Sequence, residues 1–446
     1  MKDIVEISSK LVERALSEGF DEAATIIRRN KRTMVKIANS EPSVIQHWTT
    51  TEVDLYLVKD KRIIVVSLEP SSLDEVNKSI KELLAMAKNI RESPLYAPLP
   101  EPETIQPIPE MVDKKILEST EDPSKLAELI IETAHRETKV DYVAGMIDLT
   151  YGEKALATSK NARLYEDSTS LQSYLRAFSG EDGSGQWAVG LRKLDTRKLE
   201  EMASIAARYA VESRNRVEIE PGKYDLILSP MVFGNLLDLI GWMSSAFTIF
   251  MGASIFMKNK PGDKVASSKL TIIDDPRNPE LPGSTAFDDE GINTYSKPII
   301  ENGVLKTILH NTKTATKAKT KTTGNAGWIV PQPWNLVVTP GDYKLDELIA
   351  EVKRGILVTN NWYTRLQNYV EGLFSTITRD ALFLIENGKI SKPVAKLRIA
   401  DKLPRLLSNV EALGKEVYDI WWWEVRIPTK TPYILVRDVH TSKHTV

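Results

Sequence analysis

Apolar and polar residues recur at two different periods along the chain, and each period predicts one kind of element. The first segment is predicted to be a helix, because Ile4, Ile7 and Leu11 recur at helical spacing and Gly19 is placed to end it. A stretch rich in β-branched residues follows. It predicts short strands at 23–29, 33–38, 43–51, 53–58 and 63–67, with a turn at Lys59-Asp60.

A second helix and a proline-rich connection are predicted next. Residues 72–90 carry an apolar stripe at helical spacing, and Ser72 and Glu75 have the spacing of a capping box. Six prolines lie between Pro94 and Pro109, a density that excludes helix and favours extended chain. We therefore expect a first α+β part of an N-terminal domain at 1–93, and a linker at 94–110 that lies over a surface.

The middle of the chain continues the same mixture of elements. A helix is expected from Pro123 to about Arg136 with Asp122 as its cap, and a longer one over 195–214. Residues 111–220 are therefore interpreted as the continuation of the N-terminal domain, up to a boundary at Pro221-Gly222. The strands predicted in this part are 142–150, 155–158, 171–178 and 186–191.

Strand signals dominate beyond the boundary, so residues 221–446 are predicted to form a second domain built mainly of antiparallel sheet. One helix is expected there, at about 231–243, directly after a strand at 224–228. Seven of the nine Trp lie beyond residue 222, which indicates a bulky core or a buried subunit surface. The predicted fold class is therefore α+β. The other predicted strands are 270–273, 296–301, 304–310, 336–339, 381–386 and 433–436.

The scarcity of Cys and His restricts the chemistry that the chain can perform. The 446 residues include no Cys and five His, which excludes disulfides, thiolate nucleophiles and Cys-based metal sites. Lys and Arg number 59 against 61 Asp and Glu, and the net charge of −2 argues against a strongly basic nucleic-acid-binding protein. No signal-peptide core and no apolar run of 18 residues is present, so we expect a soluble cytoplasmic protein without membrane contact.

Histidine offers one weak candidate for a metal site. His440 and His444 are the only His pair at helical spacing, but no Glu base lies beside them and they follow a predicted strand. We interpret this pair as an exposed tail. His47 and His135 stand alone and are interpreted as ordinary polar residues.

Two charged runs are further weak candidates. Asp288, Asp289 and Glu290 could hold a hard cation, although such a run is more often a solvated turn. Four lysines between 313 and 321 could attract phosphates, but without interleaved aromatic residues they indicate a solvated face. Nucleic-acid binding is therefore not expected. The four lysines are Lys313, Lys317, Lys319 and Lys321.

A series of short segments in the second half of the chain is similar to a known family. Their order and spacing resemble the C-terminal half of the TldD/PmbA family of metallopeptidases, and with the N-terminal order of elements the resemblance covers nearly the whole chain. The segments are residues 287–291, 301–310, 322–326, 361–365, 368–369, 371–375 and 385–388.

The family has two branches, which differ in one helix. In the TldD branch this helix carries H-E-x-x-x-H, and a downstream Cys helps to hold the metal. When Gly241 is placed on the family glycine, Leu237 and Trp242 occupy the two His positions and Asp238 occupies the Glu position. Leu and Trp cannot ligate zinc, so the chain resembles the PmbA (TldE) branch, whose members lack the metal motif and pair with a TldD subunit.

The resemblance implies a catalytically silent subunit. It would complete the chamber in which the zinc of a TldD-like partner cleaves unfolded or small peptides, with no catalytic residue, metal ligand or cofactor of its own; a homodimer is also considered. Asp238, the one charge of an otherwise apolar helix, is expected to be capped, paired or facing the partner. His310, within a matching segment, is another weak candidate.

Two alternatives stay open at this point. The first is an independent metal-dependent hydrolase built from His440, His444 and a carboxylate of the 288–290 run. The second is a non-enzymatic module that acts on nucleic acid or on a topoisomerase, as older names of the family suggest.

Overall fold

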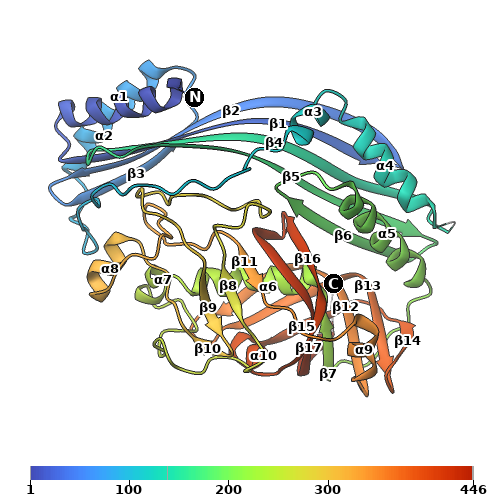
Figure 1. Ribbon diagram of the computed structural model, residues 1–446. Coiled ribbons are helices and arrows are strands. Elements are labelled where there is room, and N and C mark those ends of the chain that lie inside the picture. The colour runs from blue at the N-terminus through green and yellow to red at the C-terminus, as the bar shows by residue number, and fades with distance from the viewer. Residues whose placement is uncertain (1, 138, 444–446) are drawn as a thin grey trace.

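The computed structural model describes residues 2–137 and 139–443. A six-stranded sheet arches over a domain that contains an eleven-stranded sheet, as Figure 1 shows. The order β3-β2-β1-β4-β5-β6 of the upper sheet joins the two sequence regions on either side of the proline-rich segment, and every pairing in it is antiparallel. Its strands are β1 (Glu22–Ala38), β2 (Glu41–Lys59), β3 (Arg62–Leu68), β4 (Tyr142–Thr158), β5 (Arg163–Ser179) and β6 (Gly183–Leu191).

Three of these strands join stretches that the sequence pattern predicts as separate strands. The expected breaks at 30–32, at residue 52 and at 151–154 do not exist, because β1, β2 and β4 run continuously through them. In β1 the polar stretch from Arg28 to Arg32 stays extended because the backbone is paired with β2 on one side and β4 on the other. The turn at Lys59-Asp60 is confirmed, with Asp60 and Lys61 both in the left-handed region.

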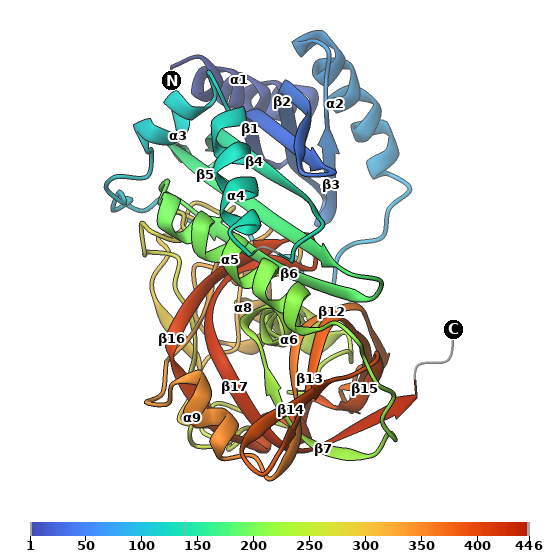
Figure 2. The same cartoon turned by 90° about the vertical axis from the view of Figure 1, so that its right-hand side faces the viewer.

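Helices α1, α2, α3 and α4 lie on the outer face of the arch, as Figure 1 shows, and α5 packs against β6 and α4. Figure 2 shows α5 at the level where the two domains meet. Two predicted caps differ in detail. Ser72 accepts from the Glu75 amide, but the Glu75 carboxylate bonds to the Ser71 amide, and α4 begins after Pro123 rather than at an Asp122 cap. The helices are α1 (Lys2–Glu18), α2 (Leu73–Ala87), α3 (Lys114–Ser119), α4 (Ser124–His135) and α5 (Thr196–Glu212).

The proline-rich segment runs without helix or strand between the arch and the lower domain. Glu22 of β1 fixes its first half by accepting bonds from the Tyr96 hydroxyl and the Leu99 amide, at 2.5 and 2.8 Å. Asn293 of the lower domain fixes its second half through the Gln106 amide, at 2.9 Å. The segment therefore contacts both domains.

The lower domain is mainly antiparallel, with two parallel pairs, β7–β12 and β11–β17. Because β7 pairs with both β12 and β17, part of the sheet closes on itself. Helix α6 (Pro230–Met243), predicted at about 231–243, packs against β17 and β12. The α+β fold class is confirmed. The remaining elements are β7 (Lys223–Leu228), α7 (Ala246–Phe250), β8 (Ile272–Asp274), β9 (Lys297–Glu301), β10 (Val304–Leu305), α8 (Thr312–Ala318), β11 (Leu336–Val338), α9 (Leu345–Ala350), β12 (Arg354–Asn368), β13 (Leu373–Glu386), β14 (Lys389–Pro393), β15 (Leu397–Lys402), α10 (Leu403–Ser408), β16 (Val410–Trp422) and β17 (Val425–Lys443).

Hydrophobic clusters join the two domains. Leu175 and Trp187 of the arch pack in the same cluster as Leu357, Phe383 and Trp422 of the lower domain. This shared cluster fixes the β16–β17 end of the lower domain against the arch. Among residues 2–137 and 139–443, no helix is both long and apolar enough to cross a membrane.

Candidate functional site

Helix α6 carries Leu237, Asp238 and Trp242, the positions that the resemblance aligns with the metal motif of the TldD branch. Ser229 caps it by accepting a bond from the Val232 amide, and the Ser229 hydroxyl donates to the Thr359 carbonyl at 2.6 Å. Leu237 is fully buried in the core of the lower domain. Trp242 is 38% exposed, and its ring lies 5.8 Å from that of Tyr369. Neither side chain offers a ligand atom for a metal ion.

Asp238 holds the start of β17. Its Oδ2 accepts from the Arg426 amide at 2.8 Å and its Oδ1 from the Ile427 amide at 3.0 Å. Burial raises the pKa of Asp238 to about 6, although the two amide bonds lower it. Both carboxylate oxygens of Asp238 are therefore used in structural hydrogen bonds. These bonds account for the residue without a role as a general base that activates water.

A network of amides and hydroxyls lies next to α6. The side-chain Nδ2 of Asn361 donates to Asn235 Oδ1 and to the Thr376 hydroxyl, each at 2.9 Å. The Thr364 hydroxyl donates to Asn235 Oδ1 at 2.5 Å. Asn235 in turn donates to the Glu424 carbonyl at 2.6 Å. Residues 361–365 are one of the matching segments of the sequence, but their partners could not be predicted, because the four chain segments meet only in the folded domain.

The acidic run at 288–290 is buried, so the expectation of a solvated turn is wrong. Asp288 accepts bonds from the amides of Glu290, Ile292 and Ala326, each at 3.0 Å. The pKa of Asp288 is raised to about 7, mainly by burial and secondly by repulsion from Glu290, while the bonds from the Ile292 and Ala326 amides lower it. The Asp288 carboxylate thus stabilises the loop in which it lies and connects it to Ala326.

The next two acids of the run are paired with cations. Asp289 lies 3.4 Å from Arg28 of β1 and 3.8 Å from Lys154 of β4, so it contacts the arch. Glu290 pairs with Lys313 at 2.7 Å. The expectation of a solvated lysine face is therefore wrong for Lys313, which is buried. Lys317, Lys319 and Lys321 are exposed.

The structure also separates the residues of the predicted hydrolase alternative. His440 is exposed as expected, with 47% of its side chain accessible, but it lies within β17 and not in a tail, and its Nδ1 is 3.2 Å from Asp401 Oδ2. His444 lies outside the described residues. His310 is buried, its Nδ1 lies 3.3 Å from the Thr314 hydroxyl, and burial lowers its pKa. In the part of the chain that the structure describes, no three His, Asp or Glu side chains form a group that could hold a metal ion.

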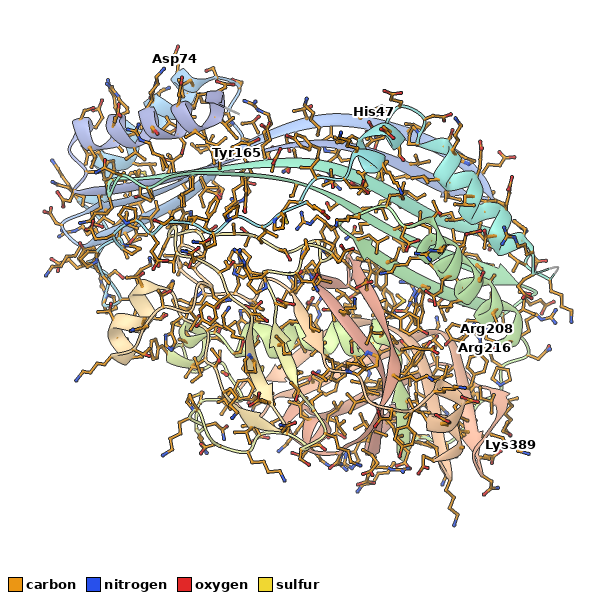
Figure 3. The ribbon with its side chains drawn as sticks, in the orientation of Figure 1. His47, Asp74, Tyr165, Arg208, Arg216 and Lys389 are labelled. Carbon is orange, nitrogen blue, oxygen red and sulfur yellow. The ribbon has the colours of Figure 1, made fainter. Side chains whose placement is uncertain are left out.

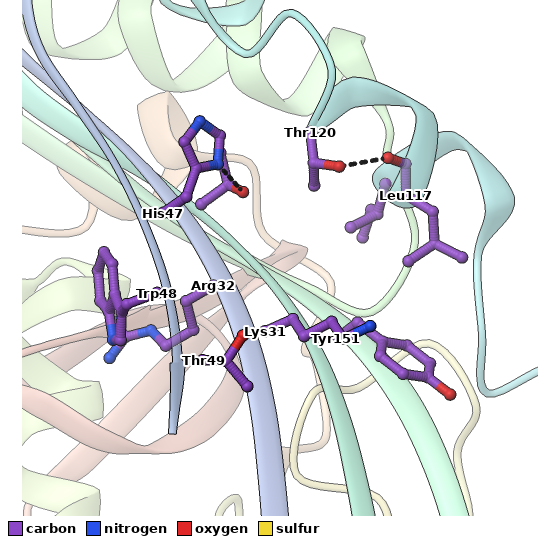
Figure 4. A pocket seen from close by; sticks show the side chains of 10 residues that line it. Lys31, Arg32, His47, Trp48, Thr49, Leu117, Thr120 and Tyr151 are labelled. Atoms are coloured by element: carbon purple, nitrogen blue, oxygen red, sulfur yellow. Dashed lines mark hydrogen bonds between the residues drawn. The ribbon is translucent and has the colours of Figure 1, made fainter. Parts of the chain in front are cut away.

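The remaining two histidines lie on the arch. His47 Nδ1 is 2.9 Å from the Thr33 hydroxyl, and His135 Nε2 is 2.8 Å from the Ser40 hydroxyl. Figure 3 shows His47 among the strands of the arch, far from the lower domain. His47 lines a cavity of about 580 Å³. Arg32 stacks on Trp48 in this cavity, with its guanidinium 4.7 Å from the ring centroid, and Figure 4 shows how these side chains lie. Arg32 is also paired with Asp148, so its charge is compensated within the arch.

Family models match most of the chain. The C-terminal domain of the PmbA/TldA metallopeptidases matches residues 221–443, their central domain matches residues 113–214, and their domain 1 matches residues 23–87. A metalloprotease of Methanocaldococcus jannaschii is 28% identical over 317 residues, which is 68% of this chain and 69% of that protein. Metalloprotease PmbA of Escherichia coli is 26% identical over 285 residues, or 61% of this chain and 60% of that protein.

Solved structures show the same fold. TldE from Thermococcus kodakarensis superimposes with a TM-score of 0.84 at 21% identity, over 97% of this chain and 99% of that one. A Thermotoga maritima protein described as a proposed modulator of a DNA gyrase gives a TM-score of 0.82 at 24% identity, over 98% of this chain and 99% of that one. At these identities the likeness establishes the fold and no further property.

Proposed function

The chain belongs to the PmbA/TldA metallopeptidase family, and from this membership we propose that it is a PmbA/TldE-like subunit without a zinc site of its own. A TldD-like partner would hold the zinc and cleave peptides. The observation that carries the proposal is the sequence of α6, which has Leu237 and Trp242 at the two positions that the resemblance aligns with the His ligands of the TldD branch. A catalytic zinc needs about three protein ligands and an open position.

The residues around these two positions do not fit a zinc ion either. Asp238 uses both of its oxygens to accept amide bonds from β17. Asn235, three residues earlier on α6, is taken up by the amide and hydroxyl network. We therefore assign to this chain no step that passes through a metal.

Exposed apolar side chains near the end of α6 support a partner subunit. Met251 is 66% exposed, and Phe250, Met257, Tyr369 and Trp242 are also exposed on the same domain. Trp242 and Tyr369 are in ring contact. Exposed aromatic and Met side chains are typical of subunit interfaces, and a PmbA-like chain would use this surface to complete an enclosed peptidase.

The test compares the chain alone with its mixture with the TldD-like protein of the same cell. We expect no stoichiometric zinc and no peptide hydrolysis from the chain alone, a mixed complex in size-exclusion chromatography, and hydrolysis of an unfolded peptide by the mixture. Stoichiometric zinc with hydrolysis by the chain alone would overturn the proposal, and so would an active TldD-like protein that neither binds nor needs this chain.

A pair of surface variants tests the interface. Met251→Asp places a charge among the exposed apolar residues and should weaken the mixed complex at least tenfold. Met86→Asp on α2 is the matched control, because Met86 is also a largely exposed methionine but lies on the arch. If both variants assemble as the unchanged chain does, the surface near α6 is not the interface.

Nucleic acid is not proposed as a ligand. Lys313 is buried in its pair with Glu290, so the lysine run offers three exposed charges instead of four. Three lysines on a chain with a net charge of −2 do not form the basic surface on which nucleic-acid affinity depends.

A further inference from the structure

A cavity of about 560 Å³ lies between the arch and the lower domain. Tyr174, Arg176 and Phe178 of β5 line it from the arch, and Arg379 of β13 and Trp423 line it from the lower domain. The arginines carry charge and the aromatic rings provide an apolar wall. The cavity therefore combines the features of a site for a small organic ion.

The charges in this cavity do not balance. Asp380, which is fully buried, pairs with Arg176 Nε at 2.7 Å and lies 3.7 Å from Arg379 Nε. Its other oxygen accepts a bond from the Asn360 amide at 2.9 Å. The two guanidinium groups that line the cavity thus share one carboxylate, which leaves an excess of one positive charge among these three groups. Lys36, exposed at the cavity, adds to it. Arg216, outside the cavity lining, lies near Asp380 and Arg176 and has Asp182 as a further acid beside it.

Several donors at the cavity lack acceptors among the described residues. The Arg379 guanidinium, 20% exposed, has no hydrogen-bond partner there, and Arg176 uses only its Nε. The Tyr174 hydroxyl likewise has no described acceptor, and the Gln186 side chain is engaged only through its oxygen, by Asn360. These free N–H and O–H groups can bind an acceptor-only ligand.

One further acid, Glu424, lies near Arg379 but does not line the cavity. Burial lowers the pKa of Arg379, and so does the nearby Arg176, while Asp380 and, more weakly, Glu424 raise it. Glu424 Oε1 faces the Tyr363 amide at 3.4 Å, and its Oε2 faces Asn235 at 3.5 Å. Its carboxylate is therefore directed to the network beside α6.

We propose that this cavity binds a carboxylate group of a peptide, held by the guanidinium groups of Arg379 and Arg176. One carboxylate matches the excess of one positive charge, and planar guanidinium groups bind carboxylates through paired N–H bonds. Tyr174, Phe178 and Trp423 would contact the residue that bears the carboxylate. That the ligand is a peptide rests on the proposed function; that it is an anion rests on the cavity.

Fluorescence anisotropy with three labelled decapeptides tests the proposal on the full-length chain. The first probe has a free C-terminal carboxylate, the second is the same sequence amidated, and the third is amidated with one internal Glu. We expect the first to bind roughly tenfold or more tightly than the second, because bonds to a charged group are the strong ones. Tight binding of the third probe instead would identify a side-chain carboxylate as the source.

Arg379→Gln should abolish the difference between the probes, while Arg176 still pairs with Asp380. Arg365→Gln is the matched control, since Arg365 is exposed on the same domain, stacks on Tyr363 and does not line the cavity. Arg379→Lys should keep part of the preference. An unchanged melting temperature shows that each variant is folded.

Three results would overturn the inference: equal affinity for all three probes, an unchanged preference in Arg379→Gln, or saturable binding of inorganic phosphate with no binding of the peptides. The result can be separated from the proposed function. Peptidase activity of the mixture without any carboxylate preference defeats this inference alone. A carboxylate preference without peptidase activity defeats the proposed function alone.

Discussion

Lys313 Nζ lies 2.7 Å from Glu290 Oε1, and the two side chains are 4% and 0% exposed. The pair stands between α8 and the arch, because Lys313 also lies over the ring of Tyr56 at 4.6 Å. Glu290 Oε2 accepts the Thr312 amide at 2.8 Å. The segment that sequence analysis described as solvated acid and solvated lysine is in fact a buried contact between the two domains.

Removing one partner of this pair should destabilise the protein strongly. Lys313→Met leaves the Glu290 charge buried without its cation, which costs about 3–5 kcal/mol of unfolding free energy. The double variant Glu290→Gln with Lys313→Met should lose less. Urea unfolding measures both, and Lys317→Met, on an exposed residue of the same helix, should stay within about 0.5 kcal/mol of the unchanged chain. The prediction would be contradicted if Lys313→Met unfolded at the same urea concentration as Lys317→Met.

Arg192 joins the arch to the lower domain. Its guanidinium donates to the carbonyls of Thr169 at 3.1 Å and of Leu281 and Ser284 at 3.0 Å, and burial lowers its pKa to about 10. Arg192→Lys provides fewer donors in the wrong geometry and should cost about 2–3 kcal/mol. Faster proteolysis of the loop at 275–293 should accompany the loss. Arg197→Lys, at an exposed position, is the control; equal proteolysis of the two variants would argue against this role of Arg192.

The raised pKa of Asp238 should make the stability of the protein depend on pH. Its pKa is raised from 3.8 to about 6, so the folded state holds a proton that the unfolded state has already released between these values. Stability from this group is therefore lost as the pH rises from about 4 to about 6. The advantage in unfolding free energy of the unchanged chain over Asp238→Asn should shrink by about 2–3 kcal/mol between pH 4 and pH 7. An advantage that is constant or grows with pH would refute the assignment.

Gly190 allows β6 to approach the end of β16. A Cβ added at Gly190 would lie 2.2 Å from the Cβ of Trp421, so Gly190→Ala has to displace one strand. We expect a loss of about 2–4 kcal/mol and a change in tryptophan fluorescence. Gly222→Ala is the matched control, since nothing lies within 4 Å of its Cβ position. Similar melting temperatures for both variants would show that the contact with Trp421 is not tight.

Local pattern was enough to predict parts of this fold. Helix α6, its extent and the α+β class follow from apolar spacing, and the turn after Lys59 follows from its composition. The long strands did not follow, because the polar residues within β1 stay extended only through pairing with β2 and β4. Strand β12 was missed because its second half, from Trp362, is largely exposed and interrupted by register shifts.

The site shows the same limit. Leu237 and Trp242 could be named from the sequence because the resemblance aligns both with one local motif. The burial of Asp289 could not be predicted, since its partners Arg28 and Lys154 come from the arch, more than a hundred residues earlier. Asp380 and Arg176, 204 positions apart, likewise meet only because β5 and β13 line one cavity.

Strand β17 delays the folding of the lower domain until the end of synthesis. It pairs with β7, whose partner residues are made about two hundred positions before it, and also with β11, β15 and β16. At roughly 5–20 residues per second, a nascent chain presents the apolar edge of β7 for about 10–40 s before β17 emerges from the ribosome. Throughout that interval the lower domain has an open sheet and an unfinished core, which is the kind of surface that chaperones bind.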